Sequence, residues 1–165
     1  MYITFDQFST LYDPIEEKVF KRLSFDAERL IDNHTTGVDG VKKLRIAFPS
    51  EEYAKDAVMH CAGKIVNLLH QIHEAEQTAT AARGYIETEQ GLQRKIISRV
   101  EAGNEAISYS ETKLTNSSID AAVADKSVRD TLIASTIKEY FSGVTDANGV
   151  NLLYMGPYPR RYINV

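Results

Sequence analysis

The stretch SEEYAKDAVMHCAGKIVNLLHQIH, residues 50–73, decides the fold of this chain. Its apolar residues recur at three- and four-residue spacing, which places them along one face of an α-helix. They are Ala54, Val58, Cys61, Ile65, Leu68, Leu69 and Ile72. Ser50 is a favourable N-cap in front of this stripe, so we expect a helix from Ser50 to somewhere between 75 and 80. Because the stripe is continuous, this helix should form the centre of the core.

Amphipathic segments on both sides of the central helix predict the elements that pack around it. Residues 2–12 form a short apolar element. Asp13 and Pro14 then favour the start of a helix, since aspartate caps exposed amides and proline suits the first helical position. A short helix is expected over 40–48 and a final one over 118–141. The predicted fold is mainly α, a small helical bundle around one long central helix.

Residues 81–117 are an excursion from this bundle, because glycines interrupt a polar stretch that has no continuous apolar stripe. The segments 96–100 and 106–110 flank a Gly103-Asn104 pair that can supply a turn, so we expect a β-hairpin. A helix over 88–101 is the alternative interpretation.

A lone hairpin is only marginally stable in water, so this one needs a second surface to lie on. That surface belongs either to its own domain or to a neighbouring subunit. If the neighbour provides it, Ile97 and Tyr109 are the candidate contact residues.

The C-terminal residues are rich in tyrosine, proline and arginine, and no acidic residue follows Asp146. Pro157 and Pro159 favour extended backbone, and tyrosine and arginine are residue types that interfaces prefer. We therefore expect a single helical domain over 1–156 and an extended arm over 157–165, whose removal should leave the core intact. A frayed terminus is the alternative. The candidate partner-binding residues here are Tyr154, Tyr158, Arg160, Arg161 and Tyr162.

The bulk composition is that of a single globular domain of 165 residues. The net charge of −4 argues against a protein that grips nucleic acid through its phosphates. The single cysteine, Cys61, excludes an internal disulfide and suits a reducing cytoplasm. The N-terminus has no signal-peptide pattern, and no apolar run is long enough to predict a membrane span.

The sequence predicts no catalytic residue, no cofactor and no metal site. His60, His70 and His73 share the central helix, but a carboxylate-bridged site would need paired Glu-x-x-His motifs, and Asn67 stands three residues before His70. Cys61 belongs to the apolar stripe, where it acts as a small buried hydrophobic residue. Phosphate-binding loops, dinucleotide fingerprints and nucleophile elbows are absent from the sequence.

Several stretches together resemble a known family. Residues 101–109, EAGNEAISY, place an acidic residue, a glycine, a serine and a tyrosine after the central helix. Tyr140 and Phe141 end the last helix, and 149–154, GVNLLY, follow it. With the opening Tyr2-Ile3-Thr4, these features resemble the head–tail connector (adaptor) family of tailed phages and related prophages. The segment 74–95 is longer than in that family, and the chain continues past Leu-Leu-Tyr.

The resemblance implies a non-enzymatic structural subunit, made in the bacterial host cytoplasm and located in the virion neck. Such subunits form a ring, usually of twelve copies, beneath the portal protein. The ring contacts a stopper or tail-completion protein and lets DNA pass through its lumen without sequence-specific binding. The alternatives are another neck component, which would be richer in strands, a small helical metal-binding enzyme, or a helical regulator that binds DNA.

Overall fold

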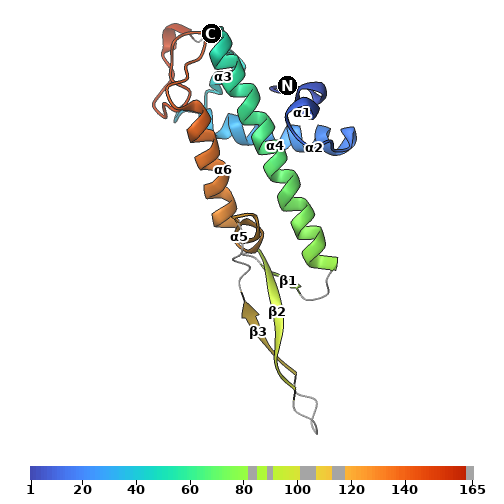
Figure 1. Ribbon diagram of the computed structural model, residues 1–165. Coiled ribbons are helices and arrows are strands. Elements are labelled where there is room, and N and C mark those ends of the chain that lie inside the picture. Colours follow the sequence, from blue (N-terminus) through green and yellow to red (C-terminus); the bar gives the residue numbers. More distant parts are fainter. Residues whose placement is uncertain (82–84, 89–90, 101–106, 113–117, 163–165) are drawn as a thin grey trace. The chain divides into compact units, whose positions relative to one another are not determined.

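The computed structural model describes residues 1–81, 85–88, 91–100, 107–112 and 118–162, with side chains for 1–78 and 118–162 (Figure 1). In chain order, its elements are α1 (Phe5–Leu11), α2 (Glu17–Thr35), α3 (Lys43–Ile46), α4 (Glu52–Ala81), β1 (Tyr85–Thr88), β2 (Gly91–Val100), β3 (Ile107–Thr112), α5 (Ser118–Ala124), α6 (Lys126–Phe141) and the 3-10 helix η1 (Arg160–Tyr162). Most of the described residues are helical, so the predicted mainly α class is confirmed.

The chain divides into two compact units. Unit 1 comprises Met1–Leu69 and Ile133–Val165, and unit 2 comprises His70–Leu132. Helices α4 and α6 contribute residues to both units.

The second helix of unit 1 starts later than the sequence predicted. Thr4 caps α1: its side chain accepts the amide of Gln7, whose own side chain accepts the amide of Thr4. The chain then leaves α1 in extended backbone at Tyr12, and α2 begins only at Glu17, after a Glu16 cap that makes no side-chain hydrogen bond. Asp13 is therefore not the cap of this helix, and that prediction was wrong.

The core of unit 1 forms around the first half of α4. Val58, Cys61 and Ile65 are fully buried. An aromatic cluster from α1 and α2 includes Phe8 and Phe20, whose ring centroids lie 5.3 Å apart. Elsewhere along α4, a Cβ atom at Gly63 would lie 2.9 Å from Ile3 and from Tyr12. A larger residue at Gly63 would therefore push the N-terminal segment away from α4.

The predicted final helix over 118–141 is two helices. Helix α5 ends at Ala124 and α6 begins at Lys126. Between them, the Asp125 carboxylate accepts a hydrogen bond from the Ser127 amide at 2.8 Å. This is the bond of an N-cap residue, so Asp125 marks the start of a new helix.

Unit 2 contains a three-stranded antiparallel sheet in the order β1-β2-β3. In β2 and β3, Ile97 pairs with Tyr109, and the register shifts between Ile97 and Arg99. Residues 91–100 are thus a strand and not the helix considered as the alternative. Helix α5 lies next to β2 within the same unit. The expected turn at Gly103-Asn104 lies outside the described residues.

Candidate interaction surfaces

Tyr158 is part of the core of unit 1 and does not project from an arm. Its side chain is 2% exposed, and its hydroxyl donates to the Asp146 carboxylate at 2.5 Å. Asn148 donates to the same hydroxyl at 3.0 Å, and the Tyr158 amide donates to Asp39 at 2.6 Å. Tyr158 cannot fill a pocket on a partner while these contacts hold. The prediction of an extended arm that starts at Pro157 and includes Tyr158 is therefore wrong.

Asp146 receives Tyr158 because a tight turn fixes its carboxylate. Its second carboxylate oxygen accepts the amides of Asn148 and Val150, each at 2.9 Å. Gly149 has a φ of 75°, a left-handed conformation that glycine adopts without strain. The pattern Asp-x-Asn-Gly was the sequence signal for this turn, but it did not reveal what the aspartate binds.

Lys43 lies buried in the same corner and joins α3 to the C-terminal segment. Its ammonium donates to the carbonyl of Leu152 at 2.9 Å and to the carbonyl of Tyr154. Burial lowers the pKa of Lys43, while the carboxylates of Asp146 and Asp39 act in the opposite direction. Burial also raises the pKa of Tyr158 to about 12. Lys43 was missed at the sequence level because its partners are more than 100 residues away.

Around this buried corner lies an exposed surface that we name the C-terminal patch: Val38, Tyr154, Met155, Arg160 and Arg161. The first three are exposed by 78%, 49% and 52%. The Val38 amide donates to the Met155 carbonyl at 2.9 Å, so the two segments lie side by side. The two arginines are exposed, and neither pairs with a carboxylate among the described residues. The Arg161 guanidinium lies 4.7 Å from the Tyr162 ring centroid.

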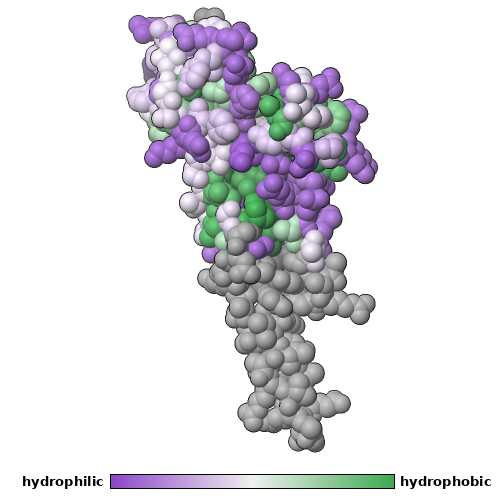
Figure 2. Space-filling view, viewed as in Figure 1, coloured by the Kyte–Doolittle hydropathy of each residue, from purple (hydrophilic) through white to green (hydrophobic). Residues whose placement is uncertain are grey.

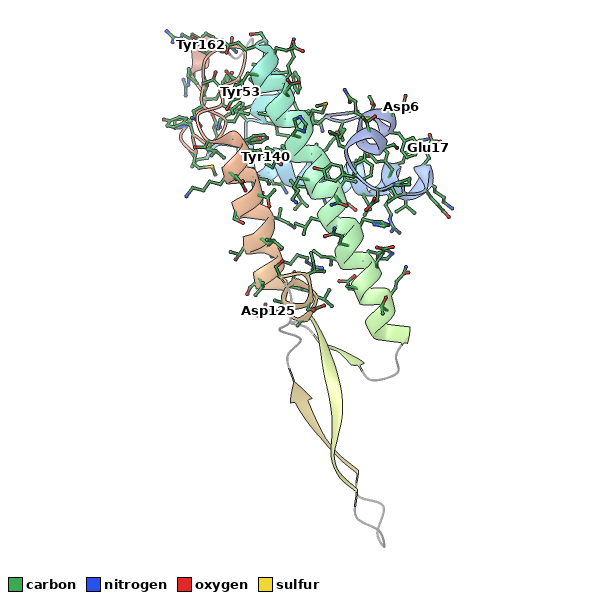
Figure 3. The ribbon with its side chains drawn as sticks, in the orientation of Figure 1. Asp6, Glu17, Tyr53, Asp125, Tyr140 and Tyr162 are labelled. Atoms are coloured by element: carbon green, nitrogen blue, oxygen red, sulfur yellow. The ribbon has the colours of Figure 1, made fainter. Side chains whose placement is uncertain are left out.

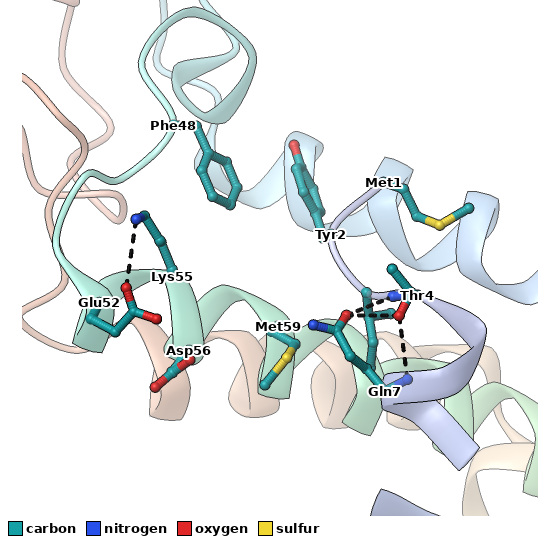
Figure 4. A pocket seen from close by; sticks show the side chains of 10 residues that line it. Met1, Tyr2, Thr4, Gln7, Phe48, Glu52, Lys55, Asp56 and Met59 are labelled. Atoms are coloured by element: carbon teal, nitrogen blue, oxygen red, sulfur yellow. Dashed lines mark hydrogen bonds and ion pairs between the residues drawn. The ribbon is translucent and has the colours of Figure 1, made fainter. Parts of the chain in front are cut away.

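A second surface of unit 1 is a pocket of about 350 Å³ that we name the N-terminal pocket (Figure 4). Its walls come from the N-terminal segment, from α1, from the residues before α4 and from the first turns of α4. The lining residues are Met1, Tyr2, Ile3, Thr4, Gln7, Phe48, Glu52, Lys55, Asp56 and Met59.

The N-terminal pocket combines exposed apolar side chains with carboxylates. Met1 is 71% and Phe48 41% exposed, and both line the opening. Glu52 lies 3.6 Å from the Lys55 ammonium, whereas Asp56 has no ion pair within the described part of the chain. The lining side chains thus carry two carboxylates and one ammonium, and the α-ammonium of Met1 is paired with Glu28 at 3.4 Å.

Polar contacts fix Tyr2, one wall of the pocket. Its hydroxyl donates to Asp32, and its ring stacks on Phe48 with centroids 6.0 Å apart. Arg45 bridges Asp32 at 2.8 Å and Glu28 at 2.9 Å. Burial raises the pKa of Tyr2, and the hydrogen bond to Asp32 raises the pKa of Arg45. The pocket is therefore preformed on this side.

Ile97 and Tyr109, the candidate contacts of the hairpin, face each other in the register of β2 and β3. The positions of their side chains lie outside the described part of the structure. Ile97 and Tyr109 belong to unit 2, whereas Tyr154, Arg160 and Arg161 belong to unit 1.

The residues considered for metal or nucleophilic chemistry are placed as ordinary helix residues. His70 lies 3.6 Å from Glu74, and His73 contacts Gln77 at 2.9 Å. Cys61 is fully buried, and burial raises its pKa to about 12. Among the described residues, no group of three or more His, Cys, Asp or Glu is arranged to hold a metal ion. In the same residues, no helix is long and apolar enough to cross a membrane.

Comparisons of this chain with protein-family models, with curated proteins and with solved structures find no significant match. Figure 2 shows that hydrophobic residues form patches between hydrophilic ones on the face it displays.

Proposed function

We propose that this chain is a non-enzymatic structural subunit of a phage head–tail connector, which forms a ring beneath the portal in the virion neck. The mainly helical fold carries this proposal, together with the family-like stretches at 101–109 and 149–154. Stopper and tail-completion proteins are richer in strands, so the helical class favours the adaptor over those neck components.

The surface chemistry of unit 1 supports a role in binding other proteins. Tyr154 and Met155 are about half exposed beside two unpaired arginines in the described chain. Exposed apolar side chains with arginine at their edge are typical of protein interfaces. In this proposal Tyr154, Arg160 and Arg161 contact a neighbouring neck protein, while Tyr158 holds the segment in place.

The sheet of unit 2 is the second element that we assign to assembly. We propose that Ile97 and Tyr109, which pair across β2 and β3, contact a neighbouring subunit. DNA would pass through the lumen of the ring without sequence-specific binding. The net charge of −4 fits this role, because a mildly acidic wall does not retain phosphates.

The test is a mass measurement of the purified protein alone and with its portal protein. We expect a folded monomer or small oligomer alone, and a complex with many copies on the portal ring. Failure to bind the portal, with retained helical circular dichroism, would refute the proposal. Stoichiometric bound metal in elemental analysis would instead favour the small helical enzyme.

A further inference from the structure

We propose that the C-terminal patch of one copy docks on the N-terminal pocket of the next copy, so that subunits join head to tail. This inference rests on the proposed ring function, and it names the two surfaces that would form the contact. The occupant of the pocket is therefore a second copy of this chain.

Charge complementarity is the first argument. The N-terminal pocket presents the carboxylates of Glu52 and Asp56 and one side-chain ammonium, Lys55. The α-ammonium of Met1 also lies at the pocket, but it is paired with Glu28 at 3.4 Å. The C-terminal patch presents the guanidinium groups of Arg160 and Arg161, which have no carboxylate partner in the described residues. Opposite charges across an interface select the partner and fix its orientation, whereas like charges on two identical surfaces repel. Patch-to-pocket pairing is thus favoured over patch-to-patch pairing.

Asp39, the residue after Val38, is a carboxylate bonded to the C-terminal segment, and it forms no ion pair with Arg160 or Arg161 among the described residues. Asp39 accepts the amide of Tyr158 at 2.6 Å and that of Val41 at 3.2 Å. These backbone bonds hold the Asp39 carboxylate at the turn, so Arg160 and Arg161 remain available to a partner.

Apolar exposure on both surfaces is the second argument. Val38, Tyr154 and Met155 are exposed on the patch, and Met1 and Phe48 are exposed at the pocket. Exposed charge pairs contribute at most about 1 kcal/mol each, so burial of these apolar side chains must supply most of the affinity. The pocket of about 350 Å³ has room for a side chain from the patch.

The placement of the two surfaces in unit 1 is the third argument. The C-terminal segment lies on one side of α4, and α1 with the N-terminal segment lies on the other (Figure 1). In Figure 3, Tyr162 and Tyr53 lie on the C-terminal side, and Asp6 lies across α4. Two different surfaces of one subunit form a heterologous contact, which generates a ring when the rotation closes.

Cross-linking tests this contact in the full chain. Met59→Cys lies in the pocket and Met155→Cys in the patch, while native Cys61 is buried and does not compete. The two variants are mixed, one of them carrying a tag, and treated with a short bismaleimide. The yield of the cross-linked pair should be at least about fivefold higher than the yield for either variant mixed with Lys18→Cys. Equal yields with Lys18→Cys would overturn the inference.

Charge reversal gives the second readout. Arg160→Glu with Arg161→Glu, or Glu52→Lys with Asp56→Lys, should each reduce the cross-linking at least about fivefold, and mixing the two double variants should restore it. Lys18→Glu with Arg22→Glu, an equal change of charge on exposed residues of α2, should have no effect. Insensitivity to both reversals, or no restoration in the mixture, would overturn the inference. If a ring still forms on the portal in that case, the proposed function stands. If the Met59→Cys and Met155→Cys variants cross-link but neither they nor the wild type bind portal, the proposed function fails alone.

Discussion

Replacement of Tyr158 with alanine should destabilise the protein by about 3–5 kcal/mol, the usual cost of truncating a buried aromatic residue. The side chain is 2% exposed, and its hydroxyl bonds the buried Asp146 at 2.5 Å. The substitution leaves a cavity and removes a hydrogen bond from a charged acceptor. Tyr158→Phe separates these effects, because it removes only the hydroxyl and should cost about 1.5–3 kcal/mol.

The expected loss is large compared with the free energy of unfolding of a typical domain, about 5–15 kcal/mol. For a chain of this size, each kcal/mol lowers the melting temperature by about 2–4 °C, so Tyr158→Ala should lower it by about 6–20 °C. Circular dichroism during thermal and urea unfolding measures both quantities. Tyr53→Ala is the matched control, since Tyr53 is 69% exposed and its loss should change stability by less than about 0.5 kcal/mol.

A Tyr158→Ala variant that unfolds within 1 kcal/mol of the wild type, about the error of such comparisons, would refute this reasoning. It would mean that the C-terminal segment leaves unit 1 without consequence. The structure also reverses the expectation that removal of 157–165 leaves the core intact, because that truncation deletes Tyr158. The truncated protein should melt at least as low as Tyr158→Ala.

Four further predictions follow from buried groups and from the sheet. Tyr158→Phe should lose less stability than the wild type as pH rises from about 10 to about 12. The pKa of Tyr158 is higher in the folded protein than in the unfolded chain, so Tyr158 stabilises the fold at pH values below its unfolded pKa, and this contribution is lost as pH rises through its folded pKa. Cys61 should not react with a thiol reagent at neutral pH until urea unfolds the protein, and reaction in native buffer would contradict its burial. Lys43→Met should cost about 1–3 kcal/mol in urea unfolding, because two backbone carbonyls lose their donor. Changing Ile97 and Tyr109 together to serine should leave the monomer's melting unchanged and block ring formation on the portal; a large fall in monomer stability would place the strand pair inside its own subunit.

Local periodicity in the sequence predicted the helical class correctly because it reports which face of a helix is buried. The element boundaries depended on finer contacts. Asp13 has the composition of a helix cap, but the chain remains extended until Glu16 as it turns from α1 into α2. Asp125 interrupts a segment with uniform helix propensity, because its carboxylate caps a new helix at Ser127. In both cases an aspartate can either cap a helix or lie in another conformation, and tertiary packing determines which of the two occurs.

The C-terminal segment shows why composition misplaced one residue of the candidate surface. Tyrosine and arginine favour an interface equally well in the sequence, but a tyrosine also serves as a core residue when its hydroxyl finds a partner. The Tyr158 hydroxyl donates to Asp146, which lies in a turn 12 residues earlier, and the Tyr158 amide donates to Asp39, which is 119 residues away in the sequence. Arg160 and Arg161, by contrast, are exposed. The buried tyrosine thus orders the segment that presents the two arginines, which lowers the entropy lost when they bind a partner.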